Sequence, residues 1–458
     1  MKILRPAPAF LVSCLLTMLP GVDAEAHGDG AHEEKEIGNA APAGSGSAGP
    51  YPSSNINLLA NLPLSAIGGT AGVLGSDLWG WNDPSTNSEY ALFGRTDGTA
   101  FVNITNPTNP IYLGSLPSAT GNTAWRDIKV YQDHAFIVSD NNGNHGMQIF
   151  DLKTLRGVTS PTTFTETAHY SGFQRAHNVA INEDTGFAYA VGTDTDSGGL
   201  HIVNIQNPAV PVFAGSFGAD GYTHDAQVVT YHGPDAQYGG KEIAFNSNED
   251  TLTIVDVTSK SSPTQLSRTG YEQSGYAHQG WLTEDHRYFL MNDEQDETNL
   301  GVNTTTHIWD VADLDHPVHI GTYVNPILGT IDHNLYVKDG LVYEANYSSG
   351  LRVLELTDIA NGMLTEVGYF DTYPANDDTD YDGAWSVYPY FASGSIIVSD
   401  RQNGLFVLEL QSQPAVPEAQ TYTMVLVGIG LVGLQLRRQS RRTRRRCFDE
   451  PQTQAIQI

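Results

Sequence analysis

Short apolar runs separated by polar turns recur along most of this chain. One unit, residues 199–217, reads "GLHIVNIQNPAVPVFAGSF": a run of apolar and β-branched residues, a turn built on Asn and Pro, and a second apolar run. Seven units of this kind lie between residues 98 and 410. Short runs bounded by turn residues predict β-strands, and helical periodicity is almost absent from this region. Each complete unit therefore predicts a pair of neighbouring strands.

A second strand pair precedes each unit. In "HNLYVKDGLVYEAN", residues 333–346, the turn Lys338-Asp339-Gly340 joins two apolar runs. The first strand of each pair begins near one of seven aligned positions, which are separated by 47 to 55 residues: Asp77, Arg126, His177, His224, His278, His333 and Gly383. Four strands in each regular repeat are typical of a β-propeller blade. The pattern predicts one all-β domain, a seven-bladed propeller.

The ends of this domain predict how the ring closes. The seventh unit stops at "LFVLEL" without a fourth strand, whereas "LLANLPLSAIGG" before the first unit is similar to "YLGSLPSATGN", which contains a fourth strand. We therefore expect Leu58 to Leu62 to form the outer strand of the last blade, so that the N-terminal strand closes the propeller and removes an exposed sheet edge.

Both ends of the chain are predicted to carry targeting segments. Residues 1–24 are typical of a signal peptide, with Lys2 and Arg5 before an apolar run and Val22 and Ala24 placed for cleavage. Residues 25–54 predict a disordered leader, and the propeller is expected at 55–411. A linker at 412–421, a hydrophobic helix at 422–436 and a basic cytoplasmic tail at 437–458 follow.

Charge and cysteine content restrict the possible partners. The net charge is −29, although seven arginines are concentrated in "RRQSRRTRRR", so the domain itself is strongly acidic. This charge disfavours nucleic acid and favours solubility outside the cell or cation binding. Both cysteines, Cys14 and Cys447, lie outside the predicted propeller, so disulfides do not stabilise its fold.

The repeats resemble a known protein family. The words "LHIVNIQNPAVPVFAG" and "LTIVDVTSKSSP" resemble LVIVD repeats. The words "GYTHDAQVV", "YAHQGWLTEDHRYFLMNDE", "IDHNLYV" and "GAWSVYPYFASG" resemble the choice-of-anchor B family over residues 55–411. This resemblance implies an exported, surface-attached propeller and no particular activity.

The C-terminal segment resembles a sorting signal. Val416, Pro417 and Glu418, followed by the apolar stretch and the arginines, resemble the PEP-CTERM signal of Gram-negative bacteria, although Ala419 replaces its usual second proline. The resemblance implies that a sorting protease removes the helix and that the protein is passed to the cell surface. Permanent membrane anchoring by the helix is the alternative.

Four histidines at equivalent strand entrances are the main candidate site. In a propeller the inner strands run in one direction, so we expect His177, His224, His278 and His333 to gather at one mouth of the channel, beside Arg126 and Asp77. Neutral imidazoles bind transition metals, and three of them with an open position suit a catalytic Zn²⁺. The alternative is a structural ring whose polar side chains hydrogen-bond neighbouring blades.

Carboxylates and aromatic residues give further candidates. The acidic stretches 194–199, 292–297 and 377–382 predict Ca²⁺ binding less strongly than a solvated loop. Trp281 and Trp385 are expected near the histidines, where with Asp77 and Arg126 they would bind a sugar or a peptide. Packing between blades is the alternative role of these aromatic side chains.

The sequence thus predicts a binding or scaffold module whose ligand is an extracellular polymer, a peptide or a cell-surface component. The competing hypothesis is a metal-dependent extracellular hydrolase or lyase with Asp127 or Asp225 as its base. No familiar catalytic motif supports an enzyme.

Overall fold

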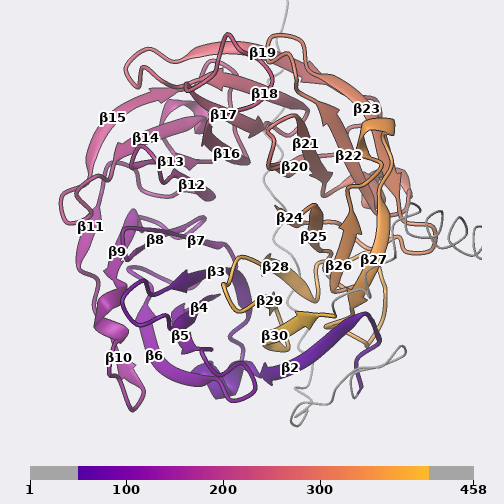
Figure 1. Ribbon diagram of the computed structural model, residues 1–458. Helices are drawn as coiled ribbons and strands as arrows, with labels where there is room; N and C mark the ends of the chain where they lie inside the picture. Colours follow the sequence, from indigo (N-terminus) through magenta and orange to yellow (C-terminus); the bar gives the residue numbers. More distant parts are fainter. Residues whose placement is uncertain (1–49, 412–458) are drawn as a thin grey trace, which may run out of the picture. The chain divides into compact units, whose positions relative to one another are not determined.

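Seven mainly antiparallel sheets make up the part of the protein that the structure describes. A computed structural model describes residues 50–411, and within this range the inner strands of consecutive sheets contact one another in a closed cycle around a central channel (Figure 1). The prediction of an all-β seven-bladed propeller is therefore confirmed.

The first four blades follow the chain from the channel outward. Blade 1 contains β3 (Gly75–Asn82), β4 (Glu89–Arg95), β5 (Gly98–Asn103) and β6 (Ile111–Pro117). Blade 2 contains β7 (Arg126–Tyr131), β8 (His134–Ser139), β9 (Met147–Asp151) and β11 (Ala168–Tyr170). Blade 3 contains β12 (Asn178–Asn182), β13 (Phe187–Val191), β14 (Leu200–Asn204) and β15 (Val212–Phe217). Blade 4 contains β16 (Asp225–Thr230), β17 (Glu242–Ser247), β18 (Thr251–Asp256) and β19 (Thr264–Gly270).

The remaining blades keep the same order. Blade 5 contains β20 (Ala277–Leu282), β21 (Tyr288–Asp293), β22 (Thr305–Asp310) and β23 (Val318–Val324). Blade 6 contains β24 (Asn334–Lys338), β25 (Leu341–Ala345), β26 (Leu351–Glu355) and β27 (Thr365–Phe370). Blade 7 contains β28 (Ala384–Tyr388), β29 (Ser395–Asp400), β30 (Gly404–Leu410) and, as its outer strand, β2 (Ile56–Leu62).

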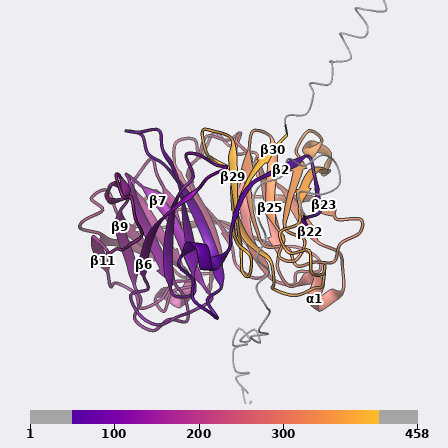
Figure 2. The same ribbon diagram turned by 90° about the horizontal axis from the view of Figure 1, so that it is seen from below.

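The predicted ring closure is confirmed. β2 pairs antiparallel with β30, with Ile56 opposite Leu410 and Leu62 opposite Leu405 (Figure 2). The apolar side chains of β2 alternate toward the sheet interior, since Leu58 is buried and its neighbour Asn57 is not. A segment that precedes the first blade therefore completes the last one.

Two blades carry a fifth strand that the repeat pattern did not predict. β1 (Ser53–Ser54) pairs antiparallel with β27, and β10 (Thr162–Thr163) pairs parallel with β6. Beside β1, Tyr51 is fully buried, so ordered structure includes residues that were predicted to belong to the leader.

Helices are few and short in residues 50–411. The α-helix is α1 (Asp296–Leu300), and 3₁₀ helices lie at Leu64–Ile67, Leu152–Leu155, Asp196–Gly198 and Ile359–Asn361. No helix in this range has the length and apolar character needed to cross a membrane. The predicted signal peptide, hydrophobic helix and basic tail lie outside the described residues.

The hydrophobic core lies between the faces of neighbouring blades. Phe101 of blade 1 stacks on Phe150 of blade 2 with 4.7 Å between ring centroids, and Phe245 of blade 4 stacks on Phe289 of blade 5 at 5.6 Å. All four side chains are buried. Because each blade packs on two others, the channel walls are held rigidly from behind.

Candidate functional site

The structure brings the four predicted histidines together in one arc. His177, His224 and His333 immediately precede inner strands, and His278 is the second residue of β20. The ring centroids of His177 and His224 are 4.3 Å apart, those of His224 and His278 are 4.2 Å apart, and those of His278 and His333 are 4.3 Å apart. Four consecutive blades therefore present a continuous row of imidazoles.

Hydrogen bonds across blade boundaries orient two of these rings. Nδ1 of His224 donates to the carbonyl of His278 at 2.9 Å, and Nδ1 of His333 donates to the carbonyl of Trp385 at 2.5 Å. With the proton held at Nδ1, Nε2 carries the lone pair that a metal ion needs. The same contacts support the structural alternative, because they join neighbouring blades.

Burial keeps most of the arc uncharged. It lowers the pKa of His224 and His278 well below 6.5 and lowers that of His333 to about 3. At His177 burial also lowers the pKa, but the carboxylate of Asp140, 3.0 Å from Nδ1, outweighs it and the net shift is upward. Three rings with lowered pKa thus lie beside one whose pKa is raised.

Glu294 completes a group that can hold a metal ion. It follows β21, and its carboxylate oxygens lie 3.7 Å from Nε2 of His278 and 3.6 Å from Nε2 of His333. The hydroxyl of Tyr347 donates to Oε1 of Glu294 at 2.9 Å. Burial raises the pKa of Glu294 to about 7. Two imidazoles and one carboxylate therefore converge, with their ligand atoms within 4.8 Å of one another.

His177 and His224 lie outside this three-residue group, although they belong to the same arc. They extend the row of rings toward Asp140. Trp385 is adjacent to the group of His278, His333 and Glu294, since its ring centroid is 5.0 Å from that of His333.

Arg126 and Asp77 lie away from the convergent group. The guanidinium of buried Arg126 donates from Nε to the carbonyl of Arg95 and lies 3.2 Å from Nε2 of His145, between blades 1 and 2. Oδ2 of Asp77 accepts from the amide of Ile128 at 3.4 Å and lies 3.7 Å from Nζ of Lys129. Both side chains connect the first two blades.

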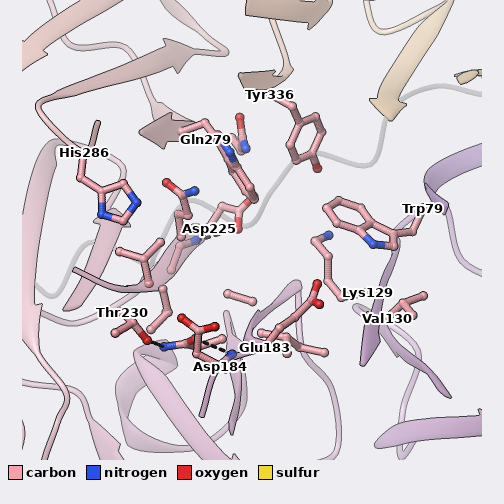
Figure 3. Close-up of a pocket in the computed structure, with 18 of the residues that line it drawn as sticks. Trp79, Lys129, Val130, Glu183, Asp184, Asp225, Thr230, Gln279, His286 and Tyr336 are labelled. Atoms are coloured by element: carbon pink, nitrogen blue, oxygen red, sulfur yellow. Dashed lines mark hydrogen bonds between the residues drawn. The ribbon is translucent and has the colours of Figure 1, made fainter. Parts of the chain in front are cut away.

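Lys129 and Asp225 line a cavity further along the channel, and Asp127 pairs with Lys129. The cavity has a volume of about 320 Å³ and is lined by residues that include Lys129, Asp225, Trp79, Trp281 and Tyr336 (Figure 3). Its wall also contains residues 182–184 and Thr230, near the ends of inner strands. Trp281 therefore faces this cavity, whereas the sequence placed it beside the histidines.

The two candidate bases differ in charge state. Burial raises the pKa of Asp225 to about 7. Asp127 is equally buried, but Lys129 pairs with its Oδ1 and the amide of Val179 donates to its Oδ2 at 2.6 Å, so its pKa is lowered. Asp225 is therefore the better proton acceptor near neutral pH, and Asp127 is a fixed anion.

Sequence reasoning missed two residues of these sites. Glu294 was assigned to an acidic loop because its position after a second strand gave no indication that it faces the histidines. Lys129 has a recognisable signal, a single lysine inside the apolar strand "RDIKVY", because a buried lysine needs an acidic partner.

Of the three acidic stretches considered for Ca²⁺, only 292–297 contributes to a group of potential metal ligands. Within residues 50–411, the groups of three potential ligands include Asp293, Asp296 and Glu297 but no residue of 194–199 or 377–382.

Comparison with known protein families identifies the repeat. An LVIVD repeat model matches residues 175–218, which cover blade 3, and residues 243–269, which lie in blade 4. No curated protein matched the chain. The chain therefore contains LVIVD repeats within a seven-bladed propeller, an architecture of general binding and scaffold modules.

Several solved structures are similar at low sequence identity. The β-propeller domain of Cps50 (Swd1) from Myceliophteria thermophila is 11% identical, with 70% of this chain and 93% of that chain covered and a TM-score of 0.46. Hydrazine synthase from Kuenenia stuttgartiensis is 12% identical, with 69% and 91% covered and a TM-score of 0.49. A Lactobacillus plantarum protein is 14% identical, with 72% and 88% covered and a TM-score of 0.47.

Proposed function

We propose that this propeller is an exported, cell-surface-attached binding module whose ligand binds at the histidine-lined mouth of the channel through a transition metal, best Zn²⁺. The convergence of His278, His333 and Glu294 carries this proposal. The predicted signal peptide and C-terminal sorting signal support the surface location, and the strongly acidic domain argues against nucleic acid as the partner.

The spacing of the three side chains suits Zn²⁺. Ligands of a tetrahedral zinc ion at about 2.1 Å stand about 3.4 Å from one another. The distances of 3.6 and 3.7 Å from the Glu294 oxygens to the two Nε2 atoms are close to this value and too long for hydrogen bonds. Three protein ligands leave a fourth position for a donor group of the ligand.

The surroundings favour a ligand that has both an anionic and an apolar part. A carboxylate of a peptide or an extracellular polymer can occupy the open metal position. The rings of Trp385 and Tyr347 border His333, with centroids 5.0 and 4.7 Å from it, so the metal ligands have an apolar, aromatic side.

Metal analysis of the purified protein tests this proposal. After loading with Zn²⁺ and dialysis, we expect the wild-type protein to retain about one zinc ion per chain. The double substitution His278→Ala and His333→Ala should abolish this zinc binding. His316→Ala is the matched control, because its side chain is 82% exposed outside the arc. Less than a tenth of an equivalent in the folded wild-type protein, or unchanged zinc content in the double variant, would refute the metal site.

The surface location needs a separate test. In the native bacterium, a membrane-impermeant biotin reagent is expected to label the protein on intact cells. After deletion of residues 412–458, the protein should no longer be labelled on the cells and should instead be found in the culture medium. Labelling only after cell lysis would contradict the proposed location.

A metal-dependent hydrolase or lyase is the second candidate function. The pKa of Asp225 near 7 favours it, because a base must titrate near the working pH. However, Asp225 lines the cavity that contains Lys129, whereas the convergent metal ligands are His278, His333 and Glu294. Zinc-dependent cleavage of an acidic polysaccharide or a peptide library, abolished in Asp225→Asn at unchanged zinc content, would establish this alternative over a binding module.

A further inference from the structure

A second group of potential ligands consists only of carboxylates. Asp296 and Glu297 begin α1, which follows β21, and Asp332 lies in the loop before β24. One oxygen from each of the three lies within 4.8 Å of the others. The exposed fractions of Asp296, Glu297 and Asp332 are only 3%, 3% and 0%. Blades 5 and 6 therefore enclose three acidic groups at their boundary.

Thr305 at the start of β22 fixes two of these carboxylates. Its hydroxyl donates to Oδ2 of Asp296 at 2.8 Å, and its amide donates to Oδ2 of Asp332 at 3.3 Å. Each aspartate therefore uses one oxygen in a hydrogen bond within the protein and keeps its second oxygen available.

The other oxygens of the group lack hydrogen-bond donors. Oδ1 of Asp296, Oδ1 of Asp332 and both carboxylate oxygens of Glu297 are buried without a hydrogen-bond partner. A buried acceptor left unpaired costs about 1–3 kcal/mol, and a charged one costs more. Four such oxygens facing one another are the surroundings expected around a bound cation.

No protein cation neutralises the group. The ion pairs found among residues 50–411 include no lysine or arginine bound to Asp296, Glu297 or Asp332. Burial and the neighbouring carboxylates raise the pKa of Asp296 to about 6 and that of Glu297 to about 10, and they also raise the pKa of Asp332.

A histidine beside the three carboxylates also has one ring nitrogen without a hydrogen-bond partner. His307 offers a ring nitrogen within 4.8 Å of oxygens of Asp293 and Asp296. Its Nδ1 lies 3.1 Å from Nε2 of His319, whereas its Nε2 is buried without a partner. This buried nitrogen without a partner is a second observation, independent of the three carboxylates, of an unsatisfied polar atom beside the group.

We propose that Asp296, Glu297 and Asp332 bind one divalent cation, best Ca²⁺, between blades 5 and 6. An all-oxygen set of three carboxylates suits a hard cation rather than Zn²⁺. Oxygens bound to Ca²⁺ at about 2.3–2.6 Å stand at most about 5 Å from one another, which agrees with the 4.8 Å limit in this group. Glu297 can supply both oxygens, and each aspartate supplies its free Oδ1.

Such an ion would fix the segment that carries Glu294. Only Gln295 separates Glu294 from Asp296 and Glu297 in the chain. A cation bound by Asp296, Glu297 and Asp332 would therefore restrain the backbone of the segment that carries Glu294. The calcium site is distinct from the zinc site of the proposed function, since the two groups share no residue.

Calcium titration of the full-length protein tests the proposal. After removal of metals with EGTA, addition of Ca²⁺ should give about one bound equivalent in calorimetry and raise the melting temperature by about 5 °C at saturation. Glu297→Gln and Asp332→Asn should each weaken Ca²⁺ binding at least about tenfold. Asp378→Asn, in an exposed acidic loop, should leave it unchanged.

The outcomes separate a calcium site from a cluster of protonated carboxyl groups. A proton-sharing cluster predicts identical melting in Ca²⁺ and in EGTA, with higher melting temperatures for both substitutions, and that result would overturn the proposal. So would Ca²⁺ binding retained in both variants. Both carboxylate oxygens of Glu297 lack partners within the protein, whereas Asp332 accepts from the amide of Thr305, so Glu297→Gln decides the question if Asp332→Asn does not fold. The variant His278→Ala, His333→Ala should retain calcium binding, so failure of the zinc site is recognised separately.

Discussion

Single charged side chains connect the blades inside the channel. The ammonium group of Lys129 pairs with Asp127, lies 3.7 Å from Asp77 and stands 4.6 Å above the ring of Trp79. The two aspartates belong to blades 1 and 2 and also accept hydrogen bonds from the backbone of the following blade. Burial raises the pKa of Asp77 well above its usual value, so Lys129 serves mainly as the counterion of Asp127, and the two aspartates together connect three blades.

Lys129→Met should destabilise the propeller strongly. It leaves the carboxylate of Asp127 buried without its counterion, and breaking a buried pair in this way costs about 3–5 kcal/mol. Urea denaturation followed by tryptophan fluorescence measures the loss. The control is Lys153→Met, because its pair with Asp151 is partly exposed and should contribute less than about 1 kcal/mol. Equal effects of the two substitutions would contradict the role of Lys129.

The carboxyl group of Asp400 predicts a pH dependence of stability. Burial raises its pKa from 3.8 to about 7, and Asp371 adds to this shift. The folded protein therefore binds this proton more tightly than the unfolded chain, so its contribution to the unfolding free energy is greatest below pH 3.8 and decreases as the pH rises to about 7.

Asp400→Asn removes this titration while keeping an acceptor for the amides of Gln402 and Asn403. Between pH 4 and pH 8, the unfolding free energy of the variant should rise relative to wild type by about 2–4 kcal/mol. Denaturant melts at several pH values measure the difference. A constant offset across this range would exclude a raised pKa at Asp400.

At the residue scale, the sequence predicted where side chains lie in the propeller better than it predicted which side chains they contact. The regular spacing of the four histidines was sufficient to place them in one arc, because equivalent residues of a propeller meet around its axis. Glu294 could not be assigned to them, because the course of a loop after a second strand is not determined by the strand pattern. The pairing of Lys129 with Asp77 and Asp127 likewise depends on side-chain directions that spacing does not specify.

At the scale of the element, an irregularity recurs between the third and fourth strands of the blades. The register shifts between Phe101 and Val102 in blade 1, and the same third-strand shift occurs in blades 3, 4, 5 and 6. Such bulges twist the outer strand locally. In blade 3, Gly215 pairs with Ile202 beside the bulged residue Ala214, and a Cβ atom at Gly215 would clash with the carbonyl oxygen of Lys260 in the next blade.

Gly215→Ala is therefore expected to force blades 3 and 4 apart. Overpacking of this kind costs about 1–3 kcal/mol, which thermal unfolding would detect. Gly239→Ala is the control, since the nearest atom to its Cβ would be 3.7 Å away. A similar melting temperature for Gly215→Ala and wild type would show that the outer strand moves without cost.

The strand pattern gave the main elements, including the closing strand, because each contains several apolar residues between turns. It did not give β1 or β10, which have two residues each. Strands of this length have no measurable alternation, and tertiary contacts alone determine their pairing.

At the scale of the whole molecule, the pairing of β2 with β30 holds the ring closed. Asn57 lies opposite Glu409, and its side-chain amide donates to Oε2 of Glu409 at 3.2 Å. The described residues contain no cysteine, so a covalent link at this position can be introduced without competing thiols in the fold.

Asn57→Cys combined with Glu409→Cys should form a disulfide that stabilises the propeller by about 2–4 kcal/mol, because it prevents the ring from opening. Cys14 and Cys447 are replaced by serine in this experiment to exclude other disulfides. The comparison is the melting temperature of the same protein before and after reduction. No difference, with complete disulfide formation verified by mass spectrometry, would show that opening between β2 and β30 does not limit stability.

The closing pair also sets the order in which the molecule can be assembled. Asn57 and Glu409 are 352 positions apart, and β2 is synthesised before the four main strands of each of blades 1 to 6, while its partner β30 follows them all. The apolar side chains of β2 therefore remain unpaired with β30 until the end of synthesis. The complete ring is available only after the last strand emerges, so the growing chain needs protection from aggregation until that moment.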